Sequence, residues 1–225
     1  RNSIGYPHLN VKIAATHAGL SVGEDGASHQ CCEDIALMRS IPGMVVLSPS
    51  DDVEARAAVI AAYNYNGPVY LRFGRLAVPV FHDAENYHFE IGKGVTLKES
   101  ADDVATVIAS GIMVDEALKA YEALEAEGIK VRVIDMFTWK PIDEDLIVKS
   151  AKETGAIVTA ENHNCTCGLG SAVARVLSAK CPTPVEMVGV HDQFGQVGAQ
   201  SFLQEAYKLT AEEIIANVKK VIARK

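Results

Sequence analysis

Short apolar runs separated by stretches with helical spacing recur along the chain, and this pattern predicts alternating strands and helices. The first run, residues 11–16, is followed by apolar runs at 44–48 and 68–74. Runs of this length without polar alternation are typical of buried parallel strands. The intervening stretches 31–40 and 53–63 have helical spacing and predict crossover helices, the second with Ser50 as its N-cap.

The second part of the chain repeats this alternation. Five more apolar runs predict strands, the first of them edge-like, at 91–97, 104–109, 131–135, 156–160 and 185–190. Helical spacing predicts helices at 114–127, from 142 and from 168. The sequence Thr210-Ala-Glu-Glu is a capping box and predicts the start of a last helix.

Residues 76–90 separate the two sets, because they lose hydrophobic periodicity and are rich in turn formers. They have the character of an interdomain linker. We therefore predict an α/β protein with two consecutive open, mostly parallel-sheet domains, residues 1–85 and 86–225. His82 and His88 are expected to be surface residues of the linker.

Composition narrows the function classes. The 225 residues carry a formal net charge of −8, which argues against a nucleic-acid-binding surface built from clustered Lys and Arg. No apolar run approaches the ~20 residues of a membrane helix, and no secretory signal opens the sequence. We expect a cytoplasmic protein whose five cysteines are free thiols.

The densest group of polar chemistry follows the first strand, in residues 17–30. Three glycines in this loop allow positive φ, so the segment can fold tightly and direct His17, Asp25 and His29 toward one cavity. Ligands of open α/β sheets bind beyond the carboxyl ends of strands. A surface connection is an equally good interpretation of the loop. The histidine spacing matches no metal-ligand pattern, and we predict no metal site.

The loop sequence His-Ala-Gly-Leu-Ser-Val-Gly-Glu-Asp-Gly-Ala-Ser-His-Gln resembles the donor-site loop of transketolase, in particular the C-terminal subunit of enzymes split into two chains. Further motifs occur in that family's order: Cys32-Glu-Asp-Ile-Ala-Leu-Met-Arg-Ser-Ile-Pro-Gly-Met, Gly67-Pro-Val-Tyr-Leu-Arg-Phe-Gly-Arg, Lys140-Pro-Ile-Asp and Gly168-Leu-Gly-Ser-Ala-Val. The resemblance covers most of the chain. It implies a partial pyrimidine-binding domain followed by the C-terminal domain of the family.

The resemblance also implies roles for single residues. His29 would be catalytic, near the thiazolium carbon of the cofactor, and Asp25 would accept a hydrogen bond from a sugar hydroxyl. His17 and Arg75 would bind the terminal phosphate of the sugar. Arg75 alone is also compatible with a paired surface arginine, and it is followed by Leu-Ala where many relatives have Gln-Asn.

The cofactor implied is thiamine diphosphate with Mg²⁺ or Ca²⁺, held mainly by the N-terminal section of the enzyme. The pyrimidine-contacting residues are expected upstream of Arg1, and no Gly-Asp-Gly motif with a following cation-binding Asn occurs here. The chain is expected to act on sugar phosphates in the pentose phosphate pathway, to form a homodimer and to be inactive without the N-terminal section. Its C-terminal domain would supply structure, with Glu161 and His163 as interdomain hydrogen-bond partners.

Three other readings remain open. A 1-deoxyxylulose-5-phosphate synthase has a similar loop, but with Asp-Arg-Ala-Gly in place of Thr16-His-Ala-Gly. The β-subunits of thiamine-dependent 2-oxoacid dehydrogenases share the architecture and lack the His-Ala-Gly loop. A non-catalytic assembly or regulatory module is the third possibility, since the chain lacks both the catalytic glutamate and the diphosphate site of the family.

Overall fold

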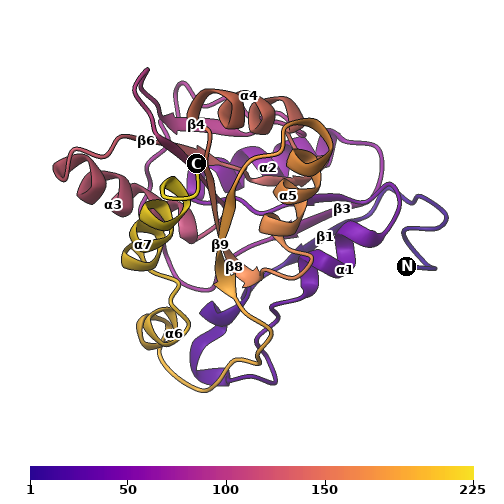
Figure 1. The fold of residues 1–225 in the computed structure, drawn as a ribbon. Coiled ribbons are helices and arrows are strands. Elements are labelled where there is room, and N and C mark those ends of the chain that lie inside the picture. Colours follow the sequence, from indigo (N-terminus) through magenta and orange to yellow (C-terminus); the bar gives the residue numbers. More distant parts are fainter.

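The computed structural model describes residues 1–225 and contains two β-sheets, each with helices on both faces (Figure 1). The fold class predicted from the sequence is confirmed. The boundary predicted near residue 85 stays a prediction. None of the helices combines the length and apolar character needed to cross a membrane.

The first sheet has the strand order β1-β3-β2-β7. Its strands are β1 (Lys12–Ala15), β3 (Val69–Arg72), β2 (Val45–Leu47) and β7 (Thr138–Lys140). The first three strands are parallel, whereas β7 runs antiparallel to β2. Strand β7 was not predicted, and it belongs to the second half of the chain. The second half therefore supplies an edge strand of the first sheet.

Helices α1 (Asp34–Ser40) and α2 (Asp52–Asn64) cover opposite faces of this sheet. Alternate residues of the strands face opposite sides. Val46 and Tyr70 share a buried cluster with Ile35 of α1. A separate cluster on the other face joins Val45, Leu47, Val69 and Leu71 to the α2 residues Ala58 and Ala62.

Asp51 caps helix α2, because its side chain accepts a hydrogen bond from the Glu54 amide over 2.9 Å. The prediction that Ser50 is the N-cap is wrong by one residue. Ser50 instead donates from its hydroxyl to the carboxylates of Glu54 and Asp135. The residue that caps α2, Asp51, is thus directly preceded by Ser50, which contacts Asp135 of the second domain.

The second sheet has the strand order β4-β6-β5-β8-β9. Its strands are β4 (Val95–Lys98), β6 (Val131–Asp135), β5 (Ala105–Ala109), β8 (Ile157–Asn164) and β9 (Val185–Val190). All neighbours are parallel except the edge strand β4, which is antiparallel to β6. Strand β8 extends four residues beyond its predicted end, and these residues bear on the site described below.

Two helices cover each face of the second sheet (Figure 1). Helices α3 (Met113–Ala126) and α7 (Ala211–Ile222) pack on one face, and α4 (Glu144–Thr154) and α5 (Leu169–Lys180) on the other. Thr210 caps α7 as the capping box predicted. A short helix that was not predicted, α6 (Gln200–Ala206), precedes α7.

The apolar core joins the two sheets. One buried cluster contains Ile35 and Tyr70 of the first domain together with Trp139, Ile134 and Ile147 of the second. The segment between β3 and β4 also contributes to the junction. His82 of this segment is 9% exposed, so its prediction as a surface residue is wrong, whereas His88 is exposed as expected. His82 is buried because its ring packs between Phe81 and Tyr87.

Candidate functional site

The loop after β1 contains a short 3-10 helical segment, η1 (Leu20–Asp25), kinked at Gly23, that the sequence pattern did not predict. Gly19, Gly23 and Gly26 have φ values of 59°, 79° and 79°, which confirms the predicted use of positive φ. An isolated bridge between Gly19 and Cys31 closes the base of the loop. The loop therefore has a defined path that returns its end to its start.

Asp25 and Arg75 lie together on the surface. The Arg75 guanidinium lies 3.7 Å from the Asp25 carboxylate and 3.1 Å from that of Glu24, and it also donates to the Val22 carbonyl. Arg75 extends from the turn that follows β3, and Asp25 ends η1. The convergence expected from the sequence is present for this pair.

The two histidines are exposed, and neither forms a hydrogen bond or ion pair with Asp25 or Arg75. His17 Nδ1 lies 2.9 Å from the Thr16 hydroxyl, and His29 Nδ1 lies 3.0 Å from the Ser28 hydroxyl. A cavity of about 510 Å³ is lined by His29 together with Phe194 and its neighbours from the second domain. Of the four predicted site residues, His29 alone lines this cavity. The roles assigned to the four residues stay predictions.

Asn162, near the end of β8, holds the start of the loop. Its side-chain oxygen accepts from the Leu20 amide over 3.0 Å, and its amide group donates to the Ala18 carbonyl over 3.1 Å. A side chain on Gly19 would collide with Asn162. Sequence reasoning missed this residue, because nothing local to the 161–164 segment marks Asn162 as a partner of a loop far away in the chain.

Gln30 holds the other end of the loop. Its side-chain amide donates to the Gly23 carbonyl over 3.2 Å and to the Gln196 carbonyl of the second domain over 2.9 Å. Helix α6 packs against η1 nearby. The second domain therefore fixes the loop at both ends, and in this way the second domain positions the loop residues.

A buried ion pair lies beneath the loop. Arg72 Nε donates to Asp34 over 2.7 Å, Tyr70 donates its hydroxyl to the same carboxylate over 2.7 Å, and Arg72 reaches the Asn162 carbonyl over 3.0 Å. Burial alone would raise the pKa of Asp34, but the charge and hydrogen bonds of Arg72 outweigh burial and the pKa falls below its ordinary value. The pair locks β3 and α1 against β8.

Glu161 and His163 flank Asn162 and are fully buried. Glu161 accepts from the Leu169 and Gly170 amides at the start of α5, so its predicted interdomain role is wrong and it caps a helix of its own domain. Burial raises the pKa of Glu161 to about 8 and lowers the pKa of His163 to about 4. His163 does reach across the domains, since its Nε2 accepts from the Ala36 amide over 3.4 Å.

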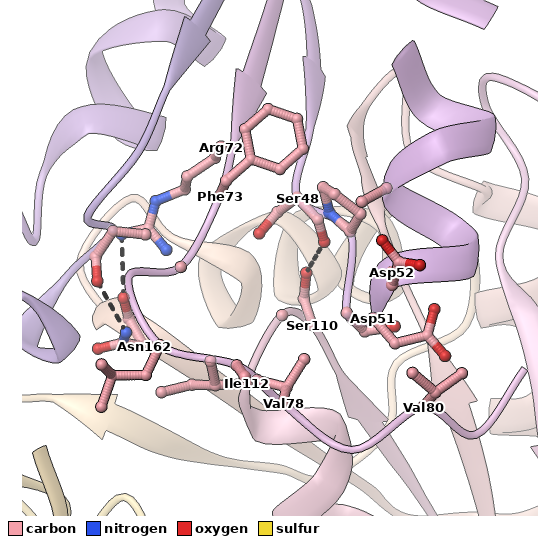
Figure 2. A pocket seen from close by; sticks show the side chains of 18 of the residues that line it. Ser48, Asp51, Asp52, Arg72, Phe73, Val78, Val80, Ser110, Ile112 and Asn162 are labelled. Atoms are coloured by element: carbon pink, nitrogen blue, oxygen red, sulfur yellow. Dashed lines mark hydrogen bonds between the residues drawn. The ribbon is translucent and has the colours of Figure 1, made fainter. Parts of the chain in front are cut away.

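A second cavity, of about 460 Å³, lies between the domains at the carboxyl ends of strands from both sheets (Figure 2). Ser48 follows β2, Phe73 follows β3, and Ser110 follows β5. The Ser110 hydroxyl donates to the Ser48 carbonyl over 3.2 Å and accepts from Trp139. None of the four predicted site residues lines this cavity, and its arginine, Arg72, is already paired.

Comparison with protein-family models gives two matches. Residues 1–80 match the transketolase pyrimidine-binding domain, and residues 92–214 match the transketolase C-terminal domain. Together the two models account for most of the chain.

Among similar proteins, the 6-deoxy-6-sulfo-D-fructose transketolase subunit SqwH of Clostridium sp. (strain MSTE9) is 44% identical over 99% of this chain and 68% of its own length. A Methanocaldococcus jannaschii protein named as a candidate transketolase C-terminal section is 44% identical over 97% of this chain and 68% of its own. One of the subunits of an apulose-4-phosphate transketolase from Phocaeicola vulgatus is 40% identical over 84% of this chain and 60% of its own.

A solved structure described as a split gene transketolase, inactive beta4 tetramer, is 50% identical and superimposes with a TM-score of 0.89 over 99% of this chain and 70% of that chain. The transketolase of Pichia stipitis, solved as a H261F mutant, shares the fold with a TM-score of 0.78 at 22% identity over 97% of this chain and 31% of that chain. The matched domains, the relatives and the shared fold show that this chain belongs to the transketolase family, as a C-terminal subunit comprising the pyrimidine-binding and C-terminal domains.

Proposed function

We propose that this chain is one half of a two-chain transketolase, which transfers a two-carbon ketol unit between ketose and aldose phosphates when the N-terminal section is bound. The observation that supports the proposal is the loop 17–30, which exposes His17, Asp25 and His29, is fixed by the second domain at both ends and lies beside Arg75. Half of a binding site can act on a substrate only when the surface of a second chain completes the site. We also propose that the chain works in the cytoplasm and forms a homodimer.

The pyrimidine-binding domain implies dependence on thiamine diphosphate. This cofactor supplies an electron sink for the carbanion left when the bond beside a carbonyl breaks. The exposed imidazoles, carboxylate and guanidinium of the loop region fit the hydroxyl and phosphate groups of a sugar. The only cluster of three metal-ligating side chains is buried and includes no loop residue. We therefore assign the diphosphate, with Mg²⁺ or Ca²⁺, mainly to the N-terminal section.

Within this half-site, His29 would exchange protons with a sugar hydroxyl, a task that suits an imidazole near neutral pH. Arg75 would bind the terminal phosphate together with His17. In the structure Arg75 faces Glu24 and Asp25. A phosphate would compete with these carboxylates for the guanidinium, and this competition would leave Asp25 free to accept from a sugar hydroxyl.

A sulfonated sugar is a second candidate donor. Arg75 is followed by Leu76 and Ala77, which offer no side-chain hydrogen bonds to an anion. A singly charged sulfonate needs fewer donors than a phosphate, which carries close to two charges at neutral pH. One similar protein is named as a transketolase subunit for 6-deoxy-6-sulfo-D-fructose.

The test is reconstitution. This chain and the N-terminal section are assayed separately and mixed, with thiamine diphosphate, a divalent cation and an aldose-phosphate acceptor. Parallel assays use a ketose-phosphate donor and its sulfonated counterpart. Product formation only in the mixture supports the proposal. Activity of this chain alone contradicts it, and a stable complex without any ketol transfer favours the assembly or regulatory module.

A further inference from the structure

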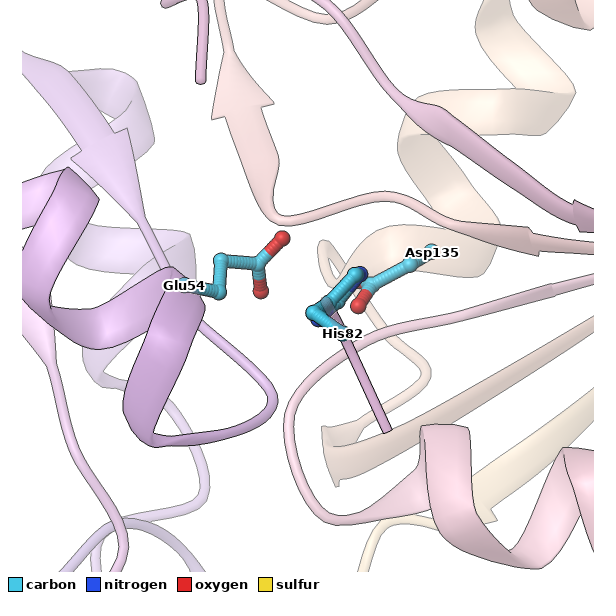
Figure 3. Close-up of side chains that lie close together, drawn as sticks. All are labelled: Glu54, His82 and Asp135. Atoms are coloured by element: carbon cyan, nitrogen blue, oxygen red, sulfur yellow. The ribbon is translucent and has the colours of Figure 1, made fainter. Parts of the chain in front are cut away.

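Three side chains that could ligate a metal converge where the domains meet (Figure 3). Glu54 lies in the first turn of α2, His82 lies in the segment between the sheets, and Asp135 ends β6. Glu54 and Asp135 are fully buried, and His82 is 9% exposed. The three residues come from separate parts of the chain, so no spacing in the sequence revealed the cluster.

The cluster contains unsatisfied polar atoms. Both ring nitrogens of His82 and the Oδ1 atom of Asp135 are buried without a hydrogen-bond partner. A buried polar group that forms no bond costs about 1–3 kcal/mol, and native proteins retain few of them. In Figure 3 the His82 ring lies beside the Asp135 carboxylate, and the Glu54 carboxylate points toward both. An ion bound by all three side chains would satisfy Asp135 Oδ1 and one ring nitrogen of His82 at once.

Glu54 and Asp135 are two buried carboxyl groups without a basic side chain to pair with. None of the ion pairs joins Glu54 or Asp135 to a Lys or Arg. The remaining bonds of Glu54 come from neutral donors, the Ser50 amide over 2.7 Å and the Tyr87 hydroxyl over 2.5 Å. Buried carboxylates are normally paired with a cationic group or bound to a metal.

The geometry fits a small divalent ion. One ligand atom from each side chain lies within 4.8 Å of the others. Bonds of about 2.0–2.2 Å to nitrogen and oxygen place the ligands of one ion roughly 3–3.5 Å apart, so small side-chain rotations are sufficient. The Asp51 carboxylate lies 3.1 Å from His82 Nδ1, close but not aligned for a hydrogen bond, and accepts from the Phe81 and His82 amides. A carboxylate beside one ring nitrogen commonly orients a histidine whose other nitrogen binds a metal.

We propose that Glu54, His82 and Asp135 bind a divalent transition-metal cation, which connects helix α2, the joining segment and the second sheet. One imidazole and two carboxylates suit Zn²⁺ or Mn²⁺ better than the all-oxygen sites of Ca²⁺. The site is enclosed and contains no predicted substrate-binding residue, so its role is structural. It is separate from the cation that accompanies thiamine diphosphate.

The test measures binding of Mn²⁺ and Zn²⁺ to the chain after treatment with a chelator. We expect the wild type to take up a single Mn²⁺ ion that Zn²⁺ displaces, with a rise in the unfolding temperature. His82→Asn removes this binding, whereas His88→Asn, at an exposed position in the same segment, keeps it. Equal uptake by the two variants, or no uptake by the wild type, overturns the proposal.

A second measurement does not depend on whether the His82 variant folds. Bound Mn²⁺ broadens the ring resonances of nearby histidines in the NMR spectrum of the wild-type chain. We expect the His82 signals to be lost first at substoichiometric Mn²⁺, before those of His17 and His29 in the exposed part of the loop after β1. Broadening confined to exposed histidines would show surface binding only and would overturn the proposal. The cluster would then be a hydrogen-bonded pair of carboxylic acids.

Discussion

The side-chain oxygen of Asn162 accepts a hydrogen bond from the Leu20 amide over 3.0 Å, so a strand of the second domain fixes the first turn of the loop in the first domain. The same side chain donates to the Ala18 carbonyl. These two bonds make Asn162 a positioning residue for a loop that it does not itself belong to.

Asn162→Ala should leave the Leu20 amide without its acceptor. We expect faster hydrogen exchange at Leu20 and a loss of kcat/KM in the reconstituted enzyme on the order of 10²-fold, because small displacements of catalytic groups cost this much. The control is Asn217→Ala, since the Asn217 side chain in α7 bonds to Glu213 and not to the loop. Unchanged exchange at Leu20 in Asn162→Ala would refute the positioning role.

Arg75→Ala tests the anion site. A charge-assisted hydrogen bond is worth about 1.5–3 kcal/mol, so we expect KM for the phosphorylated donor to rise roughly 10- to 100-fold. The KM for an unphosphorylated donor should change little. Arg56→Ala is the control, because Arg56 is exposed and pairs only with Asp52. Equal losses for both donors would argue against phosphate binding.

Asp25→Ala tests recognition of a sugar hydroxyl. Once a bound sugar covers the Asp25 carboxylate, an epimer that leaves this acceptor unpaired binds less well, so the variant should lose most of its preference between hydroxyl epimers of the donor. The preference is measured as the ratio of the two kcat/KM values. Glu24→Ala is the matched control, since Glu24 also pairs with Arg75 and is next to Asp25. If both variants keep the preference, Asp25 does not read the epimer.

The Arg72–Asp34 pair should be important for stability. Removal of one partner leaves a buried charge uncompensated, and we expect Asp34→Asn or Arg72→Met to lower the free energy of unfolding by about 3–5 kcal/mol. The double variant should be less destabilised than the sum of the single variants, because neither charge is then left alone. Urea unfolding of the four proteins measures this coupling. Strict additivity would show that the pair has no energetic connection.

His163 should make the fold sensitive to acid. Burial lowers its pKa to about 4, whereas an unfolded histidine titrates near 6.5. The unfolded state therefore binds a proton first, and stability present above pH 6.5 is lost as the pH falls toward 4, by on the order of 3 kcal/mol at most. The measurement is the urea midpoint against pH for wild type and His163→Gln.

The contribution of Glu161 to stability changes with pH in the opposite direction. The wild type and His163→Gln must therefore be compared directly. The Glu161 pKa of about 8 lies above that of an unfolded glutamate, and its contribution falls as the pH rises from about 4.5 to 8. Because both proteins contain Glu161, most of its effect cancels in the difference between their profiles, although its carboxylate lies 3.7 Å from His163 Nδ1. Parallel profiles from pH 4 to 6.5 would contradict the prediction for His163.

The repeating elements could be predicted because each depends on its own residues. The run Ala105–Ala109 is apolar throughout apart from Thr106 and forms a strand buried on both faces. Thr210 and Glu213 lie within one turn and form the expected cap. By contrast, Thr138–Lys140 becomes a strand only because the edge of β2 is open beside it. Nothing in its three residues distinguishes it from a loop.

For the candidate site, the sequence pattern indicated the loop but not the residues that hold it. Loop glycines and their neighbouring polar side chains mark residues 17–30 as unusual. The partner of this loop, Asn162, lies 142 residues away from Leu20 in the sequence. Likewise, the residues around His82 show no hydrophobic periodicity, and the burial of His82 depends on contacts with Asp51 and Tyr87. Long-range contacts of this kind are fixed by packing and leave no local pattern.

Strand β7 has a consequence for how the molecule can be divided. Because residues of the second half complete the sheet of the first, cutting the chain at the joining segment would leave β2 with open backbone donors and acceptors, a surface prone to aggregation. The two lobes should therefore melt in a single cooperative transition. If evolution transfers this part of the protein to another chain, both domains would have to be transferred together as one unit.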